Sequence, residues 1–217
     1  MTSASSTDHP EHRDLALALI AAMAANDTLA QRASRIVIAV AGESGSGKSV
    51  TAVCLAHELT ASGHVTEVLH QDDYFIRPPA ANHAHRVADL TSVGPQEVDF
   101  DRLRAHVAAF RRGEHGVAAP RVNYGTDHFD TEPRDFRSVQ ILVVEGTYVL
   151  AGVDSDIRIF LAATSDDTRE RRRARNRDIE APVVDQVLAI EHRIIAAQRE
   201  VADIVVDRDF RIVRRPG

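Results

Sequence analysis

A single eight-residue stretch, Gly42–Ser49, constrains the fold of this chain more than any other feature. It fits the phosphate-loop pattern G-x-x-x-x-G-K-[ST] at every fixed position. The apolar, β-branched run Arg35–Ala41 before it predicts a buried strand, and the run Val50–Leu59 after it, which lacks Pro and Gly, predicts a helix. A strand, a glycine-rich loop and a helix in this order form a cradle for phosphate groups at the N-terminus of the helix.

The residue types within the loop fit that purpose. The three glycines allow backbone conformations that a Cβ would forbid, so that successive N–H groups can point at phosphate oxygens. Lys48 supplies a positive charge for the β- and γ-phosphates during catalysis, and the Ser49 hydroxyl can ligate Mg²⁺. We therefore predict an ATP and Mg²⁺ site, and not a chance glycine-rich turn, formed by Gly42, Glu43, Ser44, Gly45, Ser46, Gly47, Lys48, Ser49 and Val50.

Composition narrows the class of protein. A length of 217 residues suits one α/β domain, and the net charge of −6 lacks the basic excess of nucleic-acid-binding proteins. The single cysteine, Cys54, excludes an internal disulfide framework. The apolar run Leu15–Ala25 is too short to span a bilayer and predicts an Ala-rich helix between Pro10 and Asn26. We expect a cytoplasmic protein with no nucleic-acid or membrane partner; a homo-oligomer is compatible with the sequence.

The alternation of apolar runs and helical patterns predicts a doubly wound, three-layer α/β fold with a parallel sheet. Helices are expected after the phosphate loop, from Gly94-Pro95 to Gly113, over Asp166–Arg177 and from Pro182 onward. Ile76–Gln96 and Pro120–Asp135 are expected to be long loops that build a pocket for the phosphate acceptor. The five predicted strands are Ile36–Ala41, Val65–Leu69, Val139–Val144, Ile157–Leu161 and Ile204–Val206.

Acidic residues follow two of these strands, at the sheet edge where ligands of such folds bind. Asp72 and Asp73 end the second strand, and one of them is expected to accept a proton from a substrate hydroxyl. Glu145 ends the third strand. If that strand neighbours the first, Glu145 lies beside the phosphate loop and can hold Mg²⁺ through water or orient the nucleophile.

The densest charge lies in Arg169–Arg177, where six of nine residues are arginine. Arginines four residues apart on one helix face repel one another unless an anion joins them, and a triphosphate is such an anion. The segment therefore predicts a lid near residues 166–180 that closes over ATP. A solvated helix face and an RNA-binding patch are the alternatives, the second opposed by the net negative charge.

These features together resemble the uridine kinase and phosphoribulokinase group of P-loop kinases. The resemblance covers about residues 35–207 and implies a five-stranded parallel sheet, ATP and Mg²⁺ as co-substrates, and phosphoryl transfer to a small-molecule hydroxyl, with Asp72 as the base. It divides the chain into an N-terminal extension, 1–32, and a P-loop kinase domain, 33–217. The matching stretches are Gly42–Ser49, Gln71–Phe75, Val144–Gly146, Asp156–Phe160, Arg171–Arg177 and Ala202–Val206.

Within this resemblance, Arg173 is expected to assist catalysis, and Arg171 and Arg177 to bind ATP. The departures lie on the acceptor side. Uridine kinases carry Asp-His-Pro for the ribose where this chain has Val93-Gly94-Pro95, so Asp99 or Asp101 is the expected replacement. The acceptor site is expected to include Asp73, Tyr74, Asp99, Tyr124 and His128.

A nucleoside such as uridine or cytidine is the favoured acceptor. Nicotinamide riboside, pantothenate and a sugar phosphate are alternatives within the kinase class. A non-catalytic nucleotide-binding module is the alternative of another class. A guanine-reading switch is disfavoured, because the chain lacks an Asn-Lys-x-Asp motif.

Overall fold

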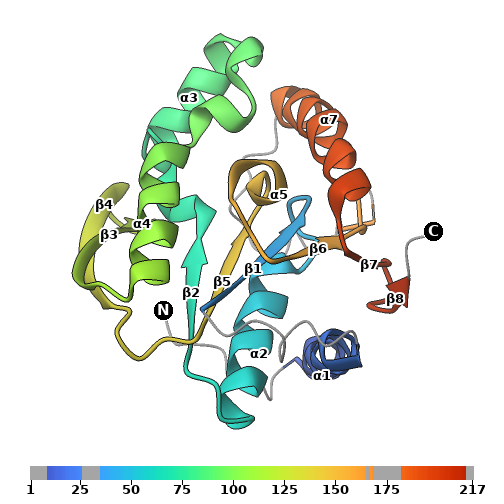
Figure 1. Ribbon diagram of the computed structural model, residues 1–217. Coiled ribbons are helices and arrows are strands. Elements are labelled where there is room, and N and C mark those ends of the chain that lie inside the picture. Colours follow the sequence, from blue (N-terminus) through green and yellow to red (C-terminus); the bar gives the residue numbers. More distant parts are fainter. Residues whose placement is uncertain (1–8, 26–34, 165–166, 169–181, 214–217) are drawn as a thin grey trace.

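A computed structural model describes residues 9–25, 35–164, 167–168 and 182–213. Its centre is a six-stranded sheet in the order β2-β5-β1-β6-β7-β8 (Figure 1). Neighbouring strands from β2 to β7 are parallel, and only the last pair, β7 and β8, is antiparallel. The predicted five-stranded parallel sheet is thus present, with one short edge strand added. The strands are β1 (Ile36–Gly42), β2 (Thr66–His70), β5 (Ile141–Gly146), β6 (Ile157–Leu161), β7 (Ile204–Val206) and β8 (Ile212–Val213).

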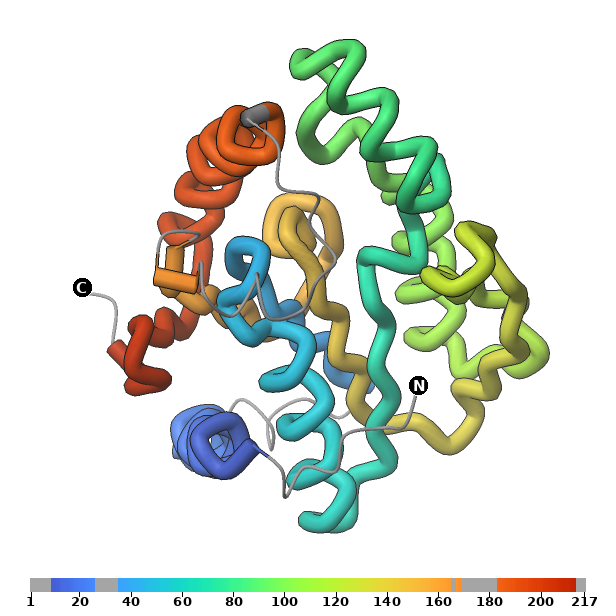
Figure 2. The backbone as a smooth tube through the Cα atoms, turned by 180° about the vertical axis from the view of Figure 1, so that it is seen from behind, coloured from blue at the N-terminus to red at the C-terminus, as the bar shows by residue number. Residues whose placement is uncertain are grey.

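Helices cover both faces of this sheet, which explains why the central strands are almost entirely apolar (Figures 1 and 2). Successive side chains of a strand point to opposite faces. Ile36, Ile38 and Val40 pack with α1 (Pro10–Ala25) and α2 (Lys48–Ala61). Their neighbours Val37, Ala39 and Ala41 pack on the other face, with α4 (Phe100–Arg112), α5 (Val149–Gly152) and the end of α7 (Pro182–Ala196).

The predicted helices have clear local causes. In α1 the buried side chains Leu15, Leu19 and Met23 are spaced by four residues and form one face against α2 and the sheet. The α4 helix begins where the Asp99 carboxylate accepts the backbone N–H of Arg102, and it ends at Gly113, whose φ of +69° favours glycine. The predicted helix over Asp166–Arg177 lies outside the described residues.

The two predicted long loops are wrong. Residues 76–96 contain helix α3 (Pro79–Ala88) and two 3₁₀ turns, Leu90–Ser92 and Pro95–Glu97. Residues 120–135 belong to a hairpin of β3 (His115–Asn123) and β4 (His128–Asp135). Prolines are tolerated in this hairpin because both strands of an isolated two-stranded ribbon are edge strands. The strands could not be recognised from the sequence, because their residues are mostly exposed and show no alternation of apolar and polar side chains.

The hairpin is attached to α3 by an exposed hydrogen bond, and to β2 and the turn after it by part-buried polar contacts. The Asp127 carboxylate accepts the backbone N–H of Ala80 at the start of α3, at 2.8 Å. The backbone N–H of Val122 donates to Asp73, also at 2.8 Å. Arg134 pairs with Glu67 on β2 at 3.0 Å. The Asp73 and Asp127 contacts hold the hairpin and α3 near the carboxyl end of β2, and the Arg134 contact fixes the hairpin to the start of that strand.

Candidate active site

The phosphate loop has the backbone that its glycines predicted. Gly45 and Gly47 have φ values of +81° and +92°, which side-chain-bearing residues rarely adopt. Gly42 serves another purpose: a Cβ there would lie 2.6 Å from Ser46 Oγ and 2.9 Å from the Leu161 carbonyl oxygen. Helix α2 begins at Lys48, so its positive end faces the loop.

Other elements brace the loop from outside. His192 of α7 contacts the buried Glu43 carboxylate at 2.6 Å. The Thr168 hydroxyl donates to the Ser44 carbonyl oxygen at 3.0 Å. His12 of α1 lies against Gly47. Of the predicted nucleotide contacts, Ser44, Gly45, Lys48 and Ser49 line a cavity, whereas Glu43 and Ser46 are buried in the loop itself.

That cavity has a volume of about 480 Å³ and lies at the carboxyl ends of the strands. Its walls come from the phosphate loop, the 3₁₀ turn Gln71–Tyr74, helix α3, the β3–β4 hairpin and helix α7. The apolar lining of α7 comes from Val183, Val184, Val187 and Leu188, and most of the remaining lining is polar or aromatic. The polar and aromatic groups that line it include Lys48, Ser49, Asp72, Phe75, Arg77, Asn82, His83, Arg86, Tyr124, Phe129, Thr147 and Glu191.

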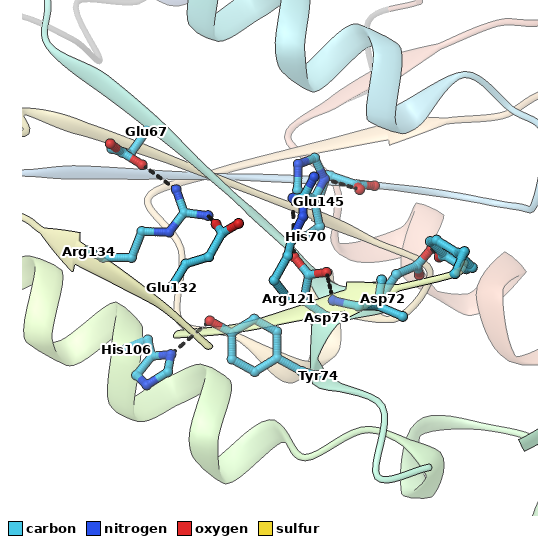
Figure 3. Close-up of polar contacts among 12 residues, drawn as sticks. Glu67, His70, Asp72, Asp73, Tyr74, His106, Arg121, Glu132, Arg134 and Glu145 are labelled. Carbon is cyan, nitrogen blue, oxygen red and sulfur yellow. Dashed lines mark hydrogen bonds and ion pairs between the residues drawn. The ribbon is translucent and has the colours of Figure 1, made fainter. Parts of the chain in front are cut away.

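The two acids after β2 face different surroundings. Asp72 lines the cavity, and its Oδ2 accepts a hydrogen bond from the Tyr124 hydroxyl at 3.4 Å. Asp73 is buried and bound to the hairpin through Val122, and Arg121 lies 3.7 Å from its carboxylate. Burial raises the pKa of Asp73, although the Val122 N–H opposes this shift. Asp72 is therefore positioned for chemistry, and Asp73 anchors the hairpin (Figure 3).

Glu145 lies beside the phosphate loop, as expected if β5 neighbours β1. The register places Glu145 opposite Val40 on β1 and opposite His70 on β2. Its Oε1 is 2.7 Å from His70 Nδ1 (Figure 3). Burial alone would raise the pKa of Glu145, but the His70 hydrogen bond and the Lys48 charge lower it. The net shift of the pKa is downward, which favours the charged form of the side chain.

The donor set fits Mg²⁺. Glu145 Oε2 is buried and has no hydrogen-bond partner among the described residues, so one hard oxygen is left over for a cation or its water. Lys48 and Ser49 line the cavity, and the Lys48 charge acts on Glu145, which is buried beside the cavity and is not one of its lining residues. Ser49 and Glu145 would hold the ion, which would neutralise phosphate charge. No group of three or more potential metal-ligating His, Cys, Asp or Glu side chains occurs in the described part of the chain.

Comparison with known proteins agrees with this geometry. Residues 37–209 match the model of the Phosphoribulokinase / Uridine kinase family. The chain belongs to this family. It is 31% identical over 192 residues to the bifunctional alpha-galactosidase/sucrose kinase AgaSK of Mediterraneibacter gnavus, covering 81% of this chain and 20% of that protein.

Two further similarities cover more of the matched protein. The chain is 28% identical to the uridine kinase of Leuconostoc citreum, covering 79% of this chain and 86% of that one. The structure of a possible uridine kinase from Bacillus stearothermophilus superimposes with a TM-score of 0.63 at 16% identity, over 89% and 97% of the two chains. The chain spans 63% of the length of the uridine kinases of Vibrio vulnificus. The P-loop kinase fold predicted from sequence is confirmed.

Several acceptor residues predicted from the family pattern lie away from the cavity. The Tyr74 side chain is buried, and its hydroxyl is 2.8 Å from His106 Nδ1 on α4, on the side opposite Asp72 (Figure 3). Asp99 caps α4, and the Asp101 side chain is 96% exposed and paired with Arg104. His128 is exposed, and its ring nitrogen contacts the Asp127 carbonyl oxygen. Of the predicted acceptor residues, only Tyr124 lines the cavity.

The family pattern did not reveal the polar groups on α3 and α7. Arg86, Asn82 and Glu191 line the cavity, and Glu97 lies behind Arg86. One signal was available in the sequence. Glu191 interrupts the apolar face of α7, three residues after Leu188 and three before Ile194, where a carboxylate needs a specific reason. The predicted lid residues Arg171, Arg173 and Arg177, and the segment 166–180 as a whole, are not covered apart from 167–168.

No helix in the described parts of the chain has the length and apolar character needed to cross a membrane.

Proposed function

We propose that this protein is an ATP- and Mg²⁺-dependent kinase that transfers the γ-phosphate of ATP to a hydroxyl of a small molecule. One observation carries the proposal: the phosphate-loop residues Lys48 and Ser49 and the Asp72 carboxylate line one cavity. Phosphoryl transfer to an alcohol needs a phosphate cradle and a proton acceptor in one water-poor space. A non-catalytic nucleotide-binding module would not need Asp72 there.

The proposed reaction uses these residues in defined roles. The Asp72 carboxylate takes the proton of the acceptor hydroxyl as the hydroxyl oxygen forms a bond to the γ-phosphorus. The bond from the γ-phosphorus to the bridging oxygen breaks, and ADP leaves with that electron pair. Lys48 and the N-terminus of α2 stabilise the charge on the phosphate oxygens. Arg171, Arg173 and Arg177 are proposed to add positive charge as a lid over ATP.

The identity of the acceptor has two candidates within this proposal. A nucleoside such as uridine or cytidine is favoured by Tyr124 and Phe129, because aromatic rings in the cavity can stack on a planar base. A sugar without a base is favoured by the similarity to a sucrose kinase. Both carry a hydroxylated sugar ring.

The test is ADP formation measured with a panel of acceptors: sucrose, D-fructose, uridine, cytidine, nicotinamide riboside, pantothenate and D-fructose 6-phosphate. The Lys48→Ala variant removes the phosphate contact and should lose turnover while the melting temperature stays close to that of the wild type. Wild-type turnover in Lys48→Ala would show that the phosphate loop does not bind the donor nucleotide.

A further inference from the structure

A buried cluster of charges forms part of the cavity wall. Arg86 on α3 makes two hydrogen bonds with the Glu97 carboxylate, at 2.6 Å from Nε and 2.8 Å from Nη2. Its Nη2 also lies 3.1 Å from Glu191 Oε1 on α7. The Tyr148 hydroxyl lies 3.4 Å from the same oxygen. The cluster therefore joins the two helices that enclose the cavity.

Within this cluster Glu97 positions Arg86. The Glu97 side chain is 1% exposed, and its Oε2 also accepts the backbone N–H of Gly94 at 2.9 Å. Both carboxylate oxygens are therefore occupied, and the guanidinium plane is fixed. Glu97 lies two residues after Pro95, so it supplies a carboxylate close to where the ribose-binding acid of uridine kinases is missing. It acts through Arg86, because Arg86 and not Glu97 lines the cavity.

Three of the polar side chains that line the cavity have donor or acceptor atoms that are not used within the described part of the chain. Arg86 Nη1 and Glu191 Oε2 make no hydrogen bond with any described residue, since all the contacts found involve Arg86 Nε and Nη2 and Glu191 Oε1. Asn82 lines the same wall, is 7% exposed, and its buried Oδ1 has no partner among the described residues. Leaving the buried Asn82 Oδ1 unpaired is costly unless a ligand satisfies it, and the spare atoms of Arg86 and Glu191 are available to the same ligand.

The stability of the fold does not explain this cluster. A buried ion pair is often no more stabilising than apolar side chains of the same size, because desolvation offsets the attraction. The other cavity-lining residues of α7 are Val183, Val184, Val187 and Leu188, so apolar residues are accommodated in this space. Charged groups kept in a cavity beside a proton acceptor point to ligand recognition.

We propose that Arg86, Asn82 and Glu191 form a hydroxyl-binding subsite that recognises adjacent hydroxyls on the sugar ring of a neutral acceptor. This rests on the proposed kinase function. Adjacent hydroxyls offer two donors and two acceptors. The carboxylate and the amide oxygen accept from the hydroxyl protons, and the guanidinium donates to a hydroxyl oxygen. Two carboxylates against one guanidinium disfavour a phosphate in the subsite, so a sugar phosphate is a poor acceptor.

The experiment uses the full chain, saturating ATP and the acceptor panel above. We expect turnover with a neutral sugar or a nucleoside and little with D-fructose 6-phosphate or pantothenate. Free sugars and nucleosides both carry ring hydroxyls. Comparing turnover with sucrose and D-fructose against turnover with uridine and cytidine shows which of these two classes of acceptor the protein uses.

For the best acceptor, Glu191→Gln and Asn82→Ala are compared with the control Asp101→Asn, whose side chain is exposed outside the cavity. Glu191→Gln should raise the KM for the acceptor about 10- to 100-fold and change the KM for ATP less than about twofold. The wild type should reject a deoxy analogue lacking one ring hydroxyl, and Glu191→Gln should discriminate far less.

Three results would overturn the subsite: unchanged acceptor KM in both variants, equal rejection of the deoxy analogue by wild type and Glu191→Gln, or turnover confined to pantothenate and the sugar phosphate. In each case, loss of turnover in Lys48→Ala would leave the kinase proposal standing. Retained turnover in Lys48→Ala would instead contradict the kinase proposal itself.

Discussion

The imidazole of His12 lies against Gly47, so that a Cβ at position 47 would come within 2.5 Å of His12 Cε1. The same ring is 2.8 Å from the Thr51 hydroxyl through Nδ1, and it packs on Phe210 with the ring centroids 4.4 Å apart. The N-terminal helix and the C-terminal segment thus meet behind the phosphate loop. Helix α1, which lies within the extension 1–32, thus supports the phosphate loop directly.

His12→Ala should weaken ATP binding without touching the acceptor. Removing the imidazole leaves a gap behind Gly47 and a lost hydrogen bond to Thr51, so the loop is held less firmly. We expect the KM for ATP to rise about 2- to 10-fold. Leu17→Ala on the same helix is the control, because Leu17 is 45% exposed. Equal effects of the two variants on KM would mean that α1 contributes only to general stability.

Substitutions of Asp72 and Asp73 should have different effects, because Asp72 lines the cavity and Asp73 is bound to the hairpin. Asp72→Asn keeps the shape but cannot take the proton, so turnover should fall about 10²- to 10⁴-fold with little change in melting temperature. Asp73→Ala leaves the partly buried Val122 N–H unpaired, which should lower the melting temperature by about 3–10 °C. The reverse pattern would move the base to Asp73.

Glu145→Gln tests the metal role of the carboxylate between His70 and the phosphate loop. The amide keeps the size and loses the charge that complements a cation, so the Mg²⁺ concentration for half-maximal turnover should rise about 10-fold or more. Glu67→Gln, on β2 and paired with Arg134, is the matched control and should leave this concentration unchanged. An unaltered Mg²⁺ dependence in Glu145→Gln would contradict the assignment.

His106, whose Nδ1 lies 2.8 Å from the Tyr74 hydroxyl, should make the stability of the fold depend on pH. Burial, followed by the Arg102 charge, lowers the pKa of His106 below its ordinary value of 6.5. The unfolded chain therefore binds this proton more readily than the folded protein, and this contribution to stability, present above pH 6.5, is lost as pH falls through the lowered pKa.

The titration of His106 is tested by thermal unfolding between pH 7.5 and 5. The wild type should lose melting temperature toward low pH more steeply than His106→Gln, in which the titrating group is absent. Tyr74→Phe should keep wild-type turnover, because the hydroxyl faces α4 and not the cavity. A parallel pH dependence in wild type and His106→Gln would show that other groups account for the whole effect.

The parts of the molecule that sequence patterns predicted well are those with a strong local cause. Gly45 and Gly47 take the left-handed conformation that their spacing implied. The strand Ile36–Gly42 is buried throughout, as its uninterrupted apolar character requires. Asp72 and Glu145 stand at strand ends on the ligand side. In each case the structural feature depends on a backbone requirement or an apolar run, and a few consecutive residues are enough to recognise it.

The acceptor side was predicted less well, since its residues are brought together only by packing. The hairpin of β3 and β4 carries prolines and exposed side chains, so neither its strands nor the outward direction of His128 could be recognised from local pattern. Asp99 was a reasonable replacement for the missing acid by position. In the structure its carboxylate caps α4, and Glu97, two residues earlier, reaches the cavity wall through Arg86.

The sequence by itself determined the phosphate loop, the parallel sheet and the acids at its edge. Hydrophobic burial and backbone sterics act on neighbouring residues, so they produce short patterns in the sequence. Only the tertiary structure decided which polar side chains share the cavity. Glu191 is about a hundred residues from Arg86 in the chain, and even the Arg86–Glu97 pair, eleven residues apart, joins two separate elements, so the pairing depends on how α3 and α7 are packed. A side chain's partners in a buried site depend on distances across the fold, and no local spacing encodes them.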